Sequence, residues 1–377
     1  MDTRISIGEE NQAIPKSQIQ GPVQNFAYDS LTRLRYATTN GVGDGQYQQD
    51  YQYDSYTGNL LSRSDVGTYT YATSKPHTVS SAGTNTYVYD VNGNMTHRND
   101  GNTQWEYTYD AENRLVQIDR DGLMVNRYIY DCDGNRVARL DENNNGKIFI
   151  GNYFESVYPR NDIPDPPPVT EGGEGEGESN TVNLLPQGDI SYYYAGSQRI
   201  AMRDANGVYF LLSDHLGSSS MLIDESGQIV ESGYYLPWGG QRGDEGITTT
   251  DYGYTGQMKE DDIYYYNARW PQVPEAQRVG FDPAIGRFMQ ADSIVPLQIQ
   301  GTQAFDRYAY VNNNPVSPPP ACDYRGFPAS RTPTPPRLPS DMLHYPPKLS
   351  FADPQPCSRL SLGFLFFQYS FNGNFSE

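Results

Sequence analysis

YIYDCDGNRVAR (Tyr128–Arg139) predicts a β-hairpin. Tyr128 and Tyr130 alternate with an isoleucine, so both rings lie on one face of a strand. Asp131 opens a turn, because its short carboxylate accepts hydrogen bonds from backbone amides two or more residues later. Gly134 supplies the positive φ that closes a type I turn followed by a bulge. The remaining residues form the return strand.

The same pattern occurs in four earlier segments. They are FAYDSLTRL, YQYDSYTGNLL, YVYDVNGNM and YTYDAENRL, which begin at residues 26, 51, 87 and 107. Asn113 stands where Gly134 stands in the last hairpin, and Asn is the next most tolerant residue of left-handed φ. From one Tyr–Asp tyrosine to the next, the spacings are 25, 36, 20 and 21 residues. Periods of this size favour stacked hairpins over the alternative, an ordinary antiparallel sheet with tyrosine-rich strands.

These repeats resemble the YD repeats of the Rhs family, a group that includes polymorphic toxins and teneurin-like proteins. The resemblance covers roughly residues 23–316 and indicates a truncated or degenerate copy. The repeat-signature residues are Tyr53, Asp54, Gly58, Tyr89, Asp90, Gly93, Tyr109, Asp110, Tyr130, Asp131 and Gly134.

Later motifs resemble the Rhs repeat-associated core. SDHLGS and YLPWG come first, where the family more often has YDPFG, and YTGQ, YYYNAR, FDPAIGRF and DRYAYVNNNP follow. The core-signature residues are Asp214, His215, Gly217, Pro237, Gly239, Gly256, Tyr265, Arg269, Asp282, Pro283, Gly286, Arg287, Tyr308, Tyr310, Asn314 and Pro315. Residues 270–280 are interposed where the family runs straight from YYNARY into YDPxxGRF.

The composition favours sheets covered by amphipathic rings over a thick aliphatic interior. Tyrosine occurs 32 times, while only 36% of the residues are hydrophobic. The formal net charge of −19 argues against nucleic acid as a partner. The three cysteines cannot build a disulfide framework, and the four histidines show no metal-ligand spacing, so we expect no cofactor and no metal.

The chain divides by composition into five parts. Residues 1–22 form a partly disordered lead-in without a signal peptide, 23–160 hold the YD hairpins, 161–188 are an acidic low-complexity loop insertion, 189–316 are the core, and 317–377 are a proline-rich divergent tail. We expect a single strand over 147–154 to pair with 190–195 across the insertion. The final apolar run is too short to span a bilayer, so no transmembrane segment is expected.

Two constellations suggest chemistry that we interpret as structural. Asp214, His215 and Ser218–Ser220 could be drawn as a hydrolytic triad. Adjacent side chains of a strand point to opposite faces and no nucleophile elbow is present, so we expect a turn in which Asp214 and His215 bond the backbone. Tyr264–Tyr266 could form a sugar-stacking platform, but packing is the favoured interpretation.

Asp292 is the exception. Complete Rhs proteins end their core in a self-cleaving site thought to use two aspartates, which can share a proton so that one acts as base and the other as acid. Asp292 matches the first by its position after the GRF motif, and Asp323 is a distorted echo of the second. The proline run before Asp323 removes backbone amides that would hold the scissile segment, so we expect cleavage to be lost.

Together the sequence predicts an all-β protein in which stacked YD hairpins form a curved continuous sheet, part of an Rhs-type β-shell with a disordered tail. The resemblance implies a structural segment that encapsulates or presents a C-terminal polypeptide in toxin delivery, secreted or at the cell surface. The expected partner is its own C-terminal segment or a cargo polypeptide. A carbohydrate-binding surface adhesin whose partners are cell-surface glycans is the alternative, and an aspartate-dependent self-cleaving core is a further one.

Overall fold

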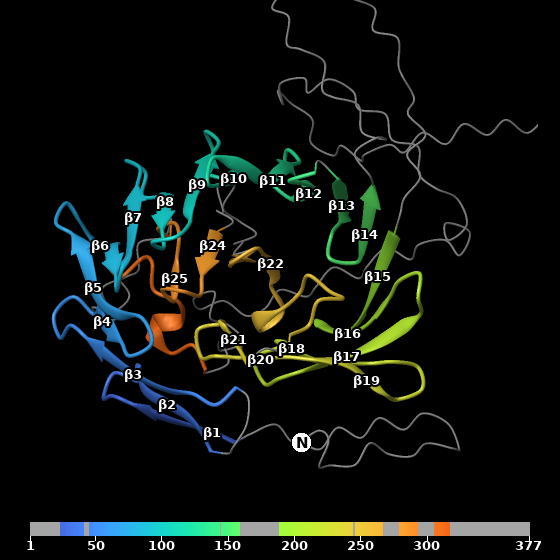
Figure 1. Cartoon of the computed structure of the whole chain (residues 1–377), viewed down its shortest axis with the longest axis horizontal. Helices are drawn as coiled ribbons and strands as arrows, with labels where there is room; N and C mark the ends of the chain where they lie inside the picture. Colours follow the sequence, from blue (N-terminus) through green and yellow to red (C-terminus); the bar gives the residue numbers. More distant parts are fainter. Residues whose placement is uncertain are drawn as a thin grey trace, which may run out of the picture. The chain divides into compact units, whose positions relative to one another are not determined.

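The computed structural model describes residues 23–40, 45–143, 145–158, 188–243, 246–266, 279–292 and 305–316. These residues are almost entirely β-structure, with 3-10 turns as their helical elements (Figure 1). Strands β1 to β19 belong to one 19-stranded sheet in this part of the chain, and β20–β21 and β22–β25 form smaller sheets. The all-β prediction is confirmed. The lead-in, most of the acidic insertion and the tail lie outside the described residues.

The elements follow one another with short connections. Their bounds are β1 Val23–Tyr28, β2 Leu34–Asn40, β3 Gln48–Tyr53, β4 Leu60–Arg63, β5 Gly67–Ala72, β6 Lys75–Ala82, β7 Asn85–Tyr89, β8 Met95–Asn99, β9 Gln104–Tyr109, β10 Leu115–Arg120, β11 Leu123–Tyr130, β12 Arg136–Asp141, β13 Gly146–Ile150, β14 Phe154–Tyr158, β15 Gly188–Ala195, β16 Gln198–Arg203, β17 Val208–Ser213, β18 Ser219–Ile223, β19 Ile229–Ser232, β20 Tyr234–Tyr235, β21 Gln241–Arg242, η2 Tyr254–Gly256, β22 Met258–Glu260, β23 Ile263–Tyr266, β24 Val279–Asp282, β25 Arg287–Phe288 and η5 Val311–Asn313.

The YD hairpins form as the sequence predicts. In the hairpin of β7 and β8, the amide of Asp90 donates to the carbonyl of Asn94, and the Asp90 carboxylate accepts from the Asn94 amide at 2.8 Å. The register shifts at the tyrosine before the aspartate, which is the expected bulge. Gly93 and Gly134 have φ of 92° and 70°, and Asn113, which replaces glycine, has φ of 59°.

Four further turns use the same aspartate chemistry, although no tyrosine precedes their aspartate. Asp141, Asp204, Asp214 and Asp224 each accept a backbone amide two residues later at 2.7–2.9 Å. The DHLGS segment of the core is therefore a YD-type turn without the tyrosine. The spacing D-x-x-G alone would have indicated three of these four turns.

The strand predicted over 147–154 is wrong. Residues 146–150 and 154–158 form two strands, β13 and β14, which pair with each other, and β14 pairs with β15. Gly151 causes the break, because its φ of 56° and the bond from the Tyr153 amide to the Ile150 carbonyl turn the chain back.

Two compact units divide the chain. The first contains residues 1–125 and 192–332, and the second contains 126–191 and 333–377, in each case as far as the residues are described. Within the second unit the Arg136 guanidinium lies 3.8 Å from the centre of the Tyr128 ring, and Lys147 pairs with the buried Glu155 at 3.3 Å. The functional motifs of the core lie in the first unit.

Candidate functional site

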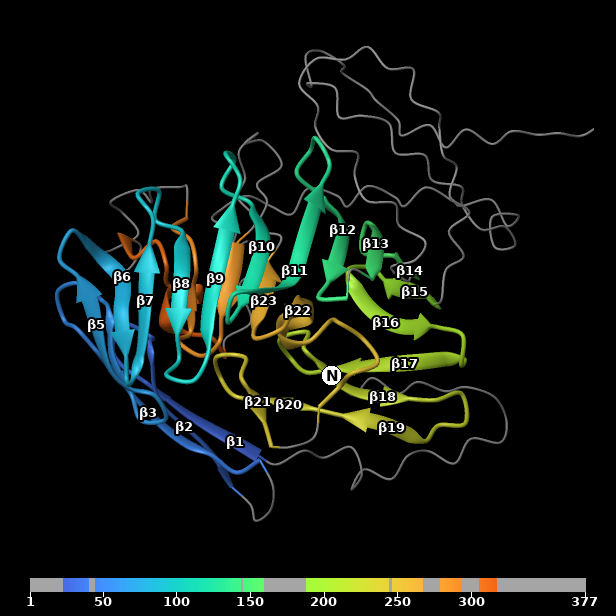
Figure 2. The ribbon, with the colours of Figure 1, turned by 45° about the horizontal axis from the view of Figure 1, so that its top comes forward.

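In the first unit η2, β22–β25 and η5, here called the core layer, lie against the repeat strands. Both views place the orange strands of this layer beside β8 and β9 (Figures 1 and 2). The Met95 amide at the start of β8 donates to the Met289 carbonyl at 2.8 Å. The Tyr308 hydroxyl donates to the carbonyl of Gly93 in a YD turn, also at 2.8 Å. Main-chain groups of the repeats are therefore bonded directly to the core layer.

Two signature glycines permit this close approach. A Cβ at Gly93 would lie 2.5 Å from the Tyr308 hydroxyl, and one at Gly286 would lie 2.8 Å from the Trp238 ring. Trp238, from the YLPWG motif, is fully buried and its ring centre lies 6.2 Å from that of Tyr51 in β3. The Gly286 amide donates to the Asp282 carbonyl at 2.8 Å, which closes a turn one residue longer than a β-turn.

Three buried arginines connect the repeats to the core layer. Arg63 in β4 donates to the carbonyls of Pro283 and Ala284 at 3.1 and 3.2 Å. Arg98 in β8 lies 2.9 Å from the carboxylate of Asp262 and 3.5 Å from that of Asp282. Each of these two side chains comes from the return strand of a hairpin.

Arg287 makes the reverse connection from the core layer. It lies 2.5 Å from the Asp306 carboxylate and donates to the His77 carbonyl of β6 at 3.3 Å. Burial lowers the pKa of the Arg287 guanidinium, but Asp306 and Tyr71 outweigh burial and raise it. Burial lowers the pKa of the His77 imidazole, partly offset by Asp306. Arg287 is therefore a permanently charged side chain that connects the core layer to the repeat strands.

The core tyrosines form a closed aromatic cluster. Tyr266 packs edge-to-face on Phe281, Phe288 and Tyr310 with ring centres 5.5–5.7 Å apart. Tyr264 and Tyr266 are 2% and 4% exposed. The Tyr264 hydroxyl donates to the Gly239 carbonyl at 3.1 Å. These rings are packed inside the protein, so they do not present a face on which a sugar could stack.

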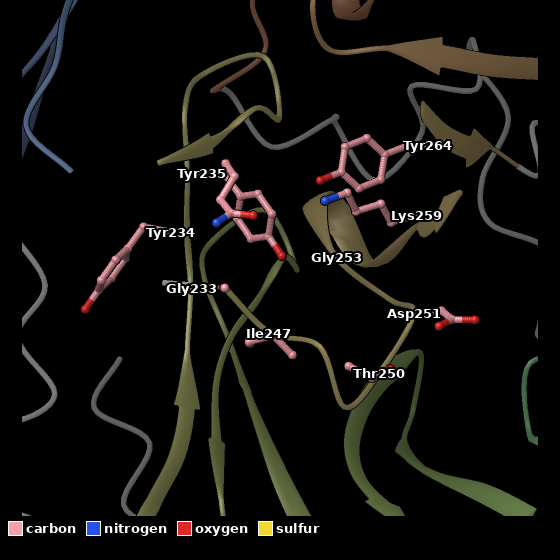
Figure 3. A pocket seen from close by; sticks show the side chains of 11 residues that line it. Gly233, Tyr234, Tyr235, Ile247, Thr250, Asp251, Gly253, Lys259 and Tyr264 are labelled. Carbon is pink, nitrogen blue, oxygen red and sulfur yellow. The ribbon is translucent and has the colours of Figure 1, made fainter. Parts of the chain in front are cut away.

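A small cavity lies beside this cluster. It has about 30 Å³ of space for water-sized groups and is lined by residues that include Tyr235, Asp251, Lys259 and Tyr264. Figure 3 shows the Lys259 amine and the Tyr264 hydroxyl pointing toward Tyr235, whereas the Asp251 carboxylate points away. Such a space holds roughly two waters and is far smaller than a small-molecule site.

The Asp214–His215 pair forms the structural turn that the sequence predicts. The Asp214 carboxylate accepts the amides of Leu216 and Ser218 at 2.8 and 2.9 Å. The His215 Nε2 lies 3.0 Å from the Val316 carbonyl oxygen. Ser218 Oγ accepts the Thr255 amide at 3.0 Å. His215 and Asp214 both bond backbone groups, and neither side chain is bonded to a serine hydroxyl in these contacts.

Asp292 is anchored by its main chain. Its amide donates to the Arg307 carbonyl at 2.9 Å, and the Arg307 side chain donates to its carbonyl. Asp323 and Arg269 lie outside the described residues, so the expected loss of cleavage stays a prediction. Within the described ranges no group of three or more His, Cys, Asp and Glu side chains is arranged to hold a metal.

One protein-family model matches part of the sequence. Residues 182–316 match the model described as "Teneurin YD-shell". Residues 182–316 are therefore similar to a YD-shell segment. The match covers the core, residues 189–316, whereas the YD repeats before residue 182 lie outside it. No curated protein matches the sequence significantly.

Among solved structures, the chain is similar to "TcdB2-TccC3 without hypervariable C-terminal region", with a TM-score of 0.43 and 16% identity over 78% of this chain. A Tc holotoxin pore structure from Photorhabdus luminescens, containing a TccC3 variant, gives the same TM-score and identity. The chain spans only 16% of the length of each of those chains. Among the helices of the described residues, none is both long and apolar enough to cross a membrane.

Proposed function

We propose that this YD-shell segment is a structural wall that encloses or presents the polypeptide following residue 316. The observation that carries the proposal is the way the core layer is built into the repeat sheet. Buried arginines and main-chain bonds hold it there, and the described core ends at Pro315 and Val316, both buried. A wall of this kind needs rigidity and protected strand edges but no active site.

The biological setting follows from the Rhs resemblance. A secreted or surface-exposed protein that delivers a toxic C-terminal segment during competition between cells would use such a wall to keep that segment away from water and partners. The acidic net charge of −19 suits a soluble wall that does not adhere to anionic membranes. The cargo is this chain's own C-terminal segment or a polypeptide in its place.

Protease protection tests the proposal. Residues 317–377 within the full chain should be cleaved at least about tenfold more slowly than the same residues as a free peptide, because a walled segment reaches the protease only when the wall opens. Mass spectrometry would follow each cleavage site over time. Equal rates in the chain and in the peptide would overturn the proposal.

The control variant Arg287→Met, which removes a tie of the core layer, should abolish most of the protection. If protection persists in this variant while the core layer is loosened, the protection does not come from the wall.

A further inference from the structure

The DHLGS turn differs from the other YD-type turns at the residue after its aspartate. In the turns that begin at Asp54, Asp90, Asp131 and Asp224 this position holds Ser, Val, Cys and Glu, and each is exposed. The side chains at these four positions make no hydrogen bond within the described part of the chain, and Val91 is 92% exposed. The DHLGS turn has His215 at this position, which is also exposed, and its Nε2 lies 3.0 Å from the Val316 carbonyl oxygen. The DHLGS turn therefore makes a side-chain contact that these four turns do not make at this position.

The turn that carries His215 is held rigidly. Besides the bonds of Asp214, the Ser219 amide donates to the Gly253 carbonyl at 3.1 Å, and Ser218 Oγ accepts the amide of Thr255 in η2. Ser218 and Ser219 are 0% and 3% exposed. These bonds fix the backbone of the turn relative to η2.

A second side chain reaches the same stretch of backbone. The Tyr254 hydroxyl, at the start of η2, lies 3.1 Å from the Pro315 carbonyl and 2.7 Å from the Pro237 carbonyl. Burial raises the pKa of Tyr254 well above its usual value, so the hydroxyl keeps its proton. Its one proton is shared between these two carbonyl oxygens.

We propose that His215 and Tyr254 form a clamp that positions the backbone of Pro315 and Val316, where the core ends and the C-terminal segment follows. A carbonyl oxygen can only accept, so His215 must carry its proton on Nε2. Both contacts are to main-chain carbonyls, so the clamp does not depend on the side chains of Pro315 and Val316. The clamp would hold the chain at the point where the C-terminal segment follows, and only this role rests on the proposed function.

Nitrogen-15 NMR of the histidine side chains in the full chain tests the clamp directly. Neutral His215 should be the Nε2–H tautomer. The Nδ1–H tautomer would overturn the proposal, because the imidazole could then not donate to Val316. This measurement needs no variant and does not depend on tail enclosure.

Amide hydrogen exchange gives the second test. His215→Ala should speed exchange at Asn313 and Asn314, whose amides donate to Tyr310 and Val311, by about fivefold, the effect of losing one hydrogen bond. His215→Gln should restore slow exchange, because its amide can donate to the same carbonyl. Tyr254→Phe should act in the same direction as His215→Ala.

The matched control is Val91→Ala, which changes the equivalent position of another turn and should leave these amides unaffected. If His215→Ala exchanges like the wild type, the clamp is wrong. If His215→Ala also speeds exchange throughout β9 and β10, the substitution has unfolded the chain. The clamp is then tested by the His215 tautomer in the wild type and by exchange in His215→Gln. If the clamp is confirmed but residues 317–377 are not protected from protease, the proposed function is overturned and the clamp is not.

Discussion

At the residue scale, the hairpins depend on one carboxylate and one left-handed residue per turn. Asp29, in the copy FAYDSLTRL, accepts the amides of Leu31 and Arg33 at 2.9 and 3.0 Å, although that copy lacks glycine. Thr32 occupies the left-handed position there with φ of 62°. A β-branched residue in this region is strained. The aspartate therefore closes the turn even where the closing residue is unfavourable.

Replacing Thr32 with glycine should stabilise the protein by about 0.5–1 kcal/mol. The left-handed conformation costs a non-glycine residue about 1–2 kcal/mol, which glycine avoids. Glycine loses more conformational entropy on folding, so the net stabilisation is smaller than this cost. Urea unfolding measures the difference. Thr57→Gly is the control and should destabilise, because Thr57 Oγ1 donates to Asp54 at 2.9 Å. Destabilisation by both changes would contradict the prediction.

Glu231 in β19 provides a pH-dependent contribution. Burial raises its pKa, but hydrogen bonds from Thr248 and Thr249 outweigh burial and hold the pKa below its usual value. A carboxyl with a lowered folded-state pKa stabilises the fold above its unfolded pKa, and this contribution disappears as the pH falls through the folded pKa. Glu231→Gln should thus lower stability at pH 7 and make little difference at acidic pH.

Denaturant titrations of wild type and Glu231→Gln at several pH values measure this contribution. Glu225→Gln, at an exposed turn position, should change stability little at any pH. A deficit in Glu231→Gln that stays constant as the carboxyl titrates would rule out the charge as its cause.

At the element scale, three tyrosine hydroxyls join a hairpin to the one before it. Tyr53 donates to the Leu34 carbonyl at 2.9 Å, and Tyr109 donates to the Met95 carbonyl at the same distance. Tyr71, which lies in a linking strand without a YD motif, donates to the Leu60 carbonyl at 2.8 Å. Each acceptor opens the return strand of an earlier hairpin. The tyrosine of the YD pair therefore bonds neighbouring hairpins as well as packing.

Removing one of these hydroxyls should cost about 0.5–1.5 kcal/mol, the net value of one hydrogen bond. Tyr53→Phe, Tyr71→Phe and Tyr109→Phe should each show this loss in chemical denaturation. Tyr56→Phe, in a turn where the ring is 87% exposed, is the matched control. Were Tyr56→Phe as costly as the other three, the hydroxyl bonds would not explain the loss.

At the scale of the whole molecule, arginine–aspartate pairs fix the core layer of the first unit. Arg287 and Asp306 are 1% and 4% exposed, so removal of either partner leaves a charge buried without compensation. Arg287→Met should cost about 3–5 kcal/mol, as measured for broken buried pairs. Arg203→Met, at an exposed position of β16, is the control.

The double variant Arg287→Met/Asp306→Asn should recover part of that loss, because no charge is then left alone. Differential scanning calorimetry of the four proteins measures both effects. A single variant as stable as Arg203→Met would mean that the pair does not hold the core layer.

The sequence by itself determined the hairpins, because their information is local. An aspartate, a residue that tolerates positive φ and alternating tyrosines lie within about ten residues, and their spacing specifies the turn and the bulge. The wrong prediction of one strand over 147–154 also has a local cause. Gly151 is a turn residue with positive φ, and the alternating pattern around it does not indicate a turn. The family resemblance also gave the order of the core motifs, although not their contacts.

Only the tertiary structure decided which distant groups meet. Arg63 and Pro283 are joined across 220 positions of sequence, and His215 and Val316 across 101. No periodic pattern encodes such pairs, because they depend on how the core layer lies across the repeat strands. Burial likewise decided that Tyr264 and Tyr266 pack inside the protein, since the same alternation of tyrosines would suit an open face. Local hydrogen-bond chemistry thus sets each hairpin, and long-range packing sets the site.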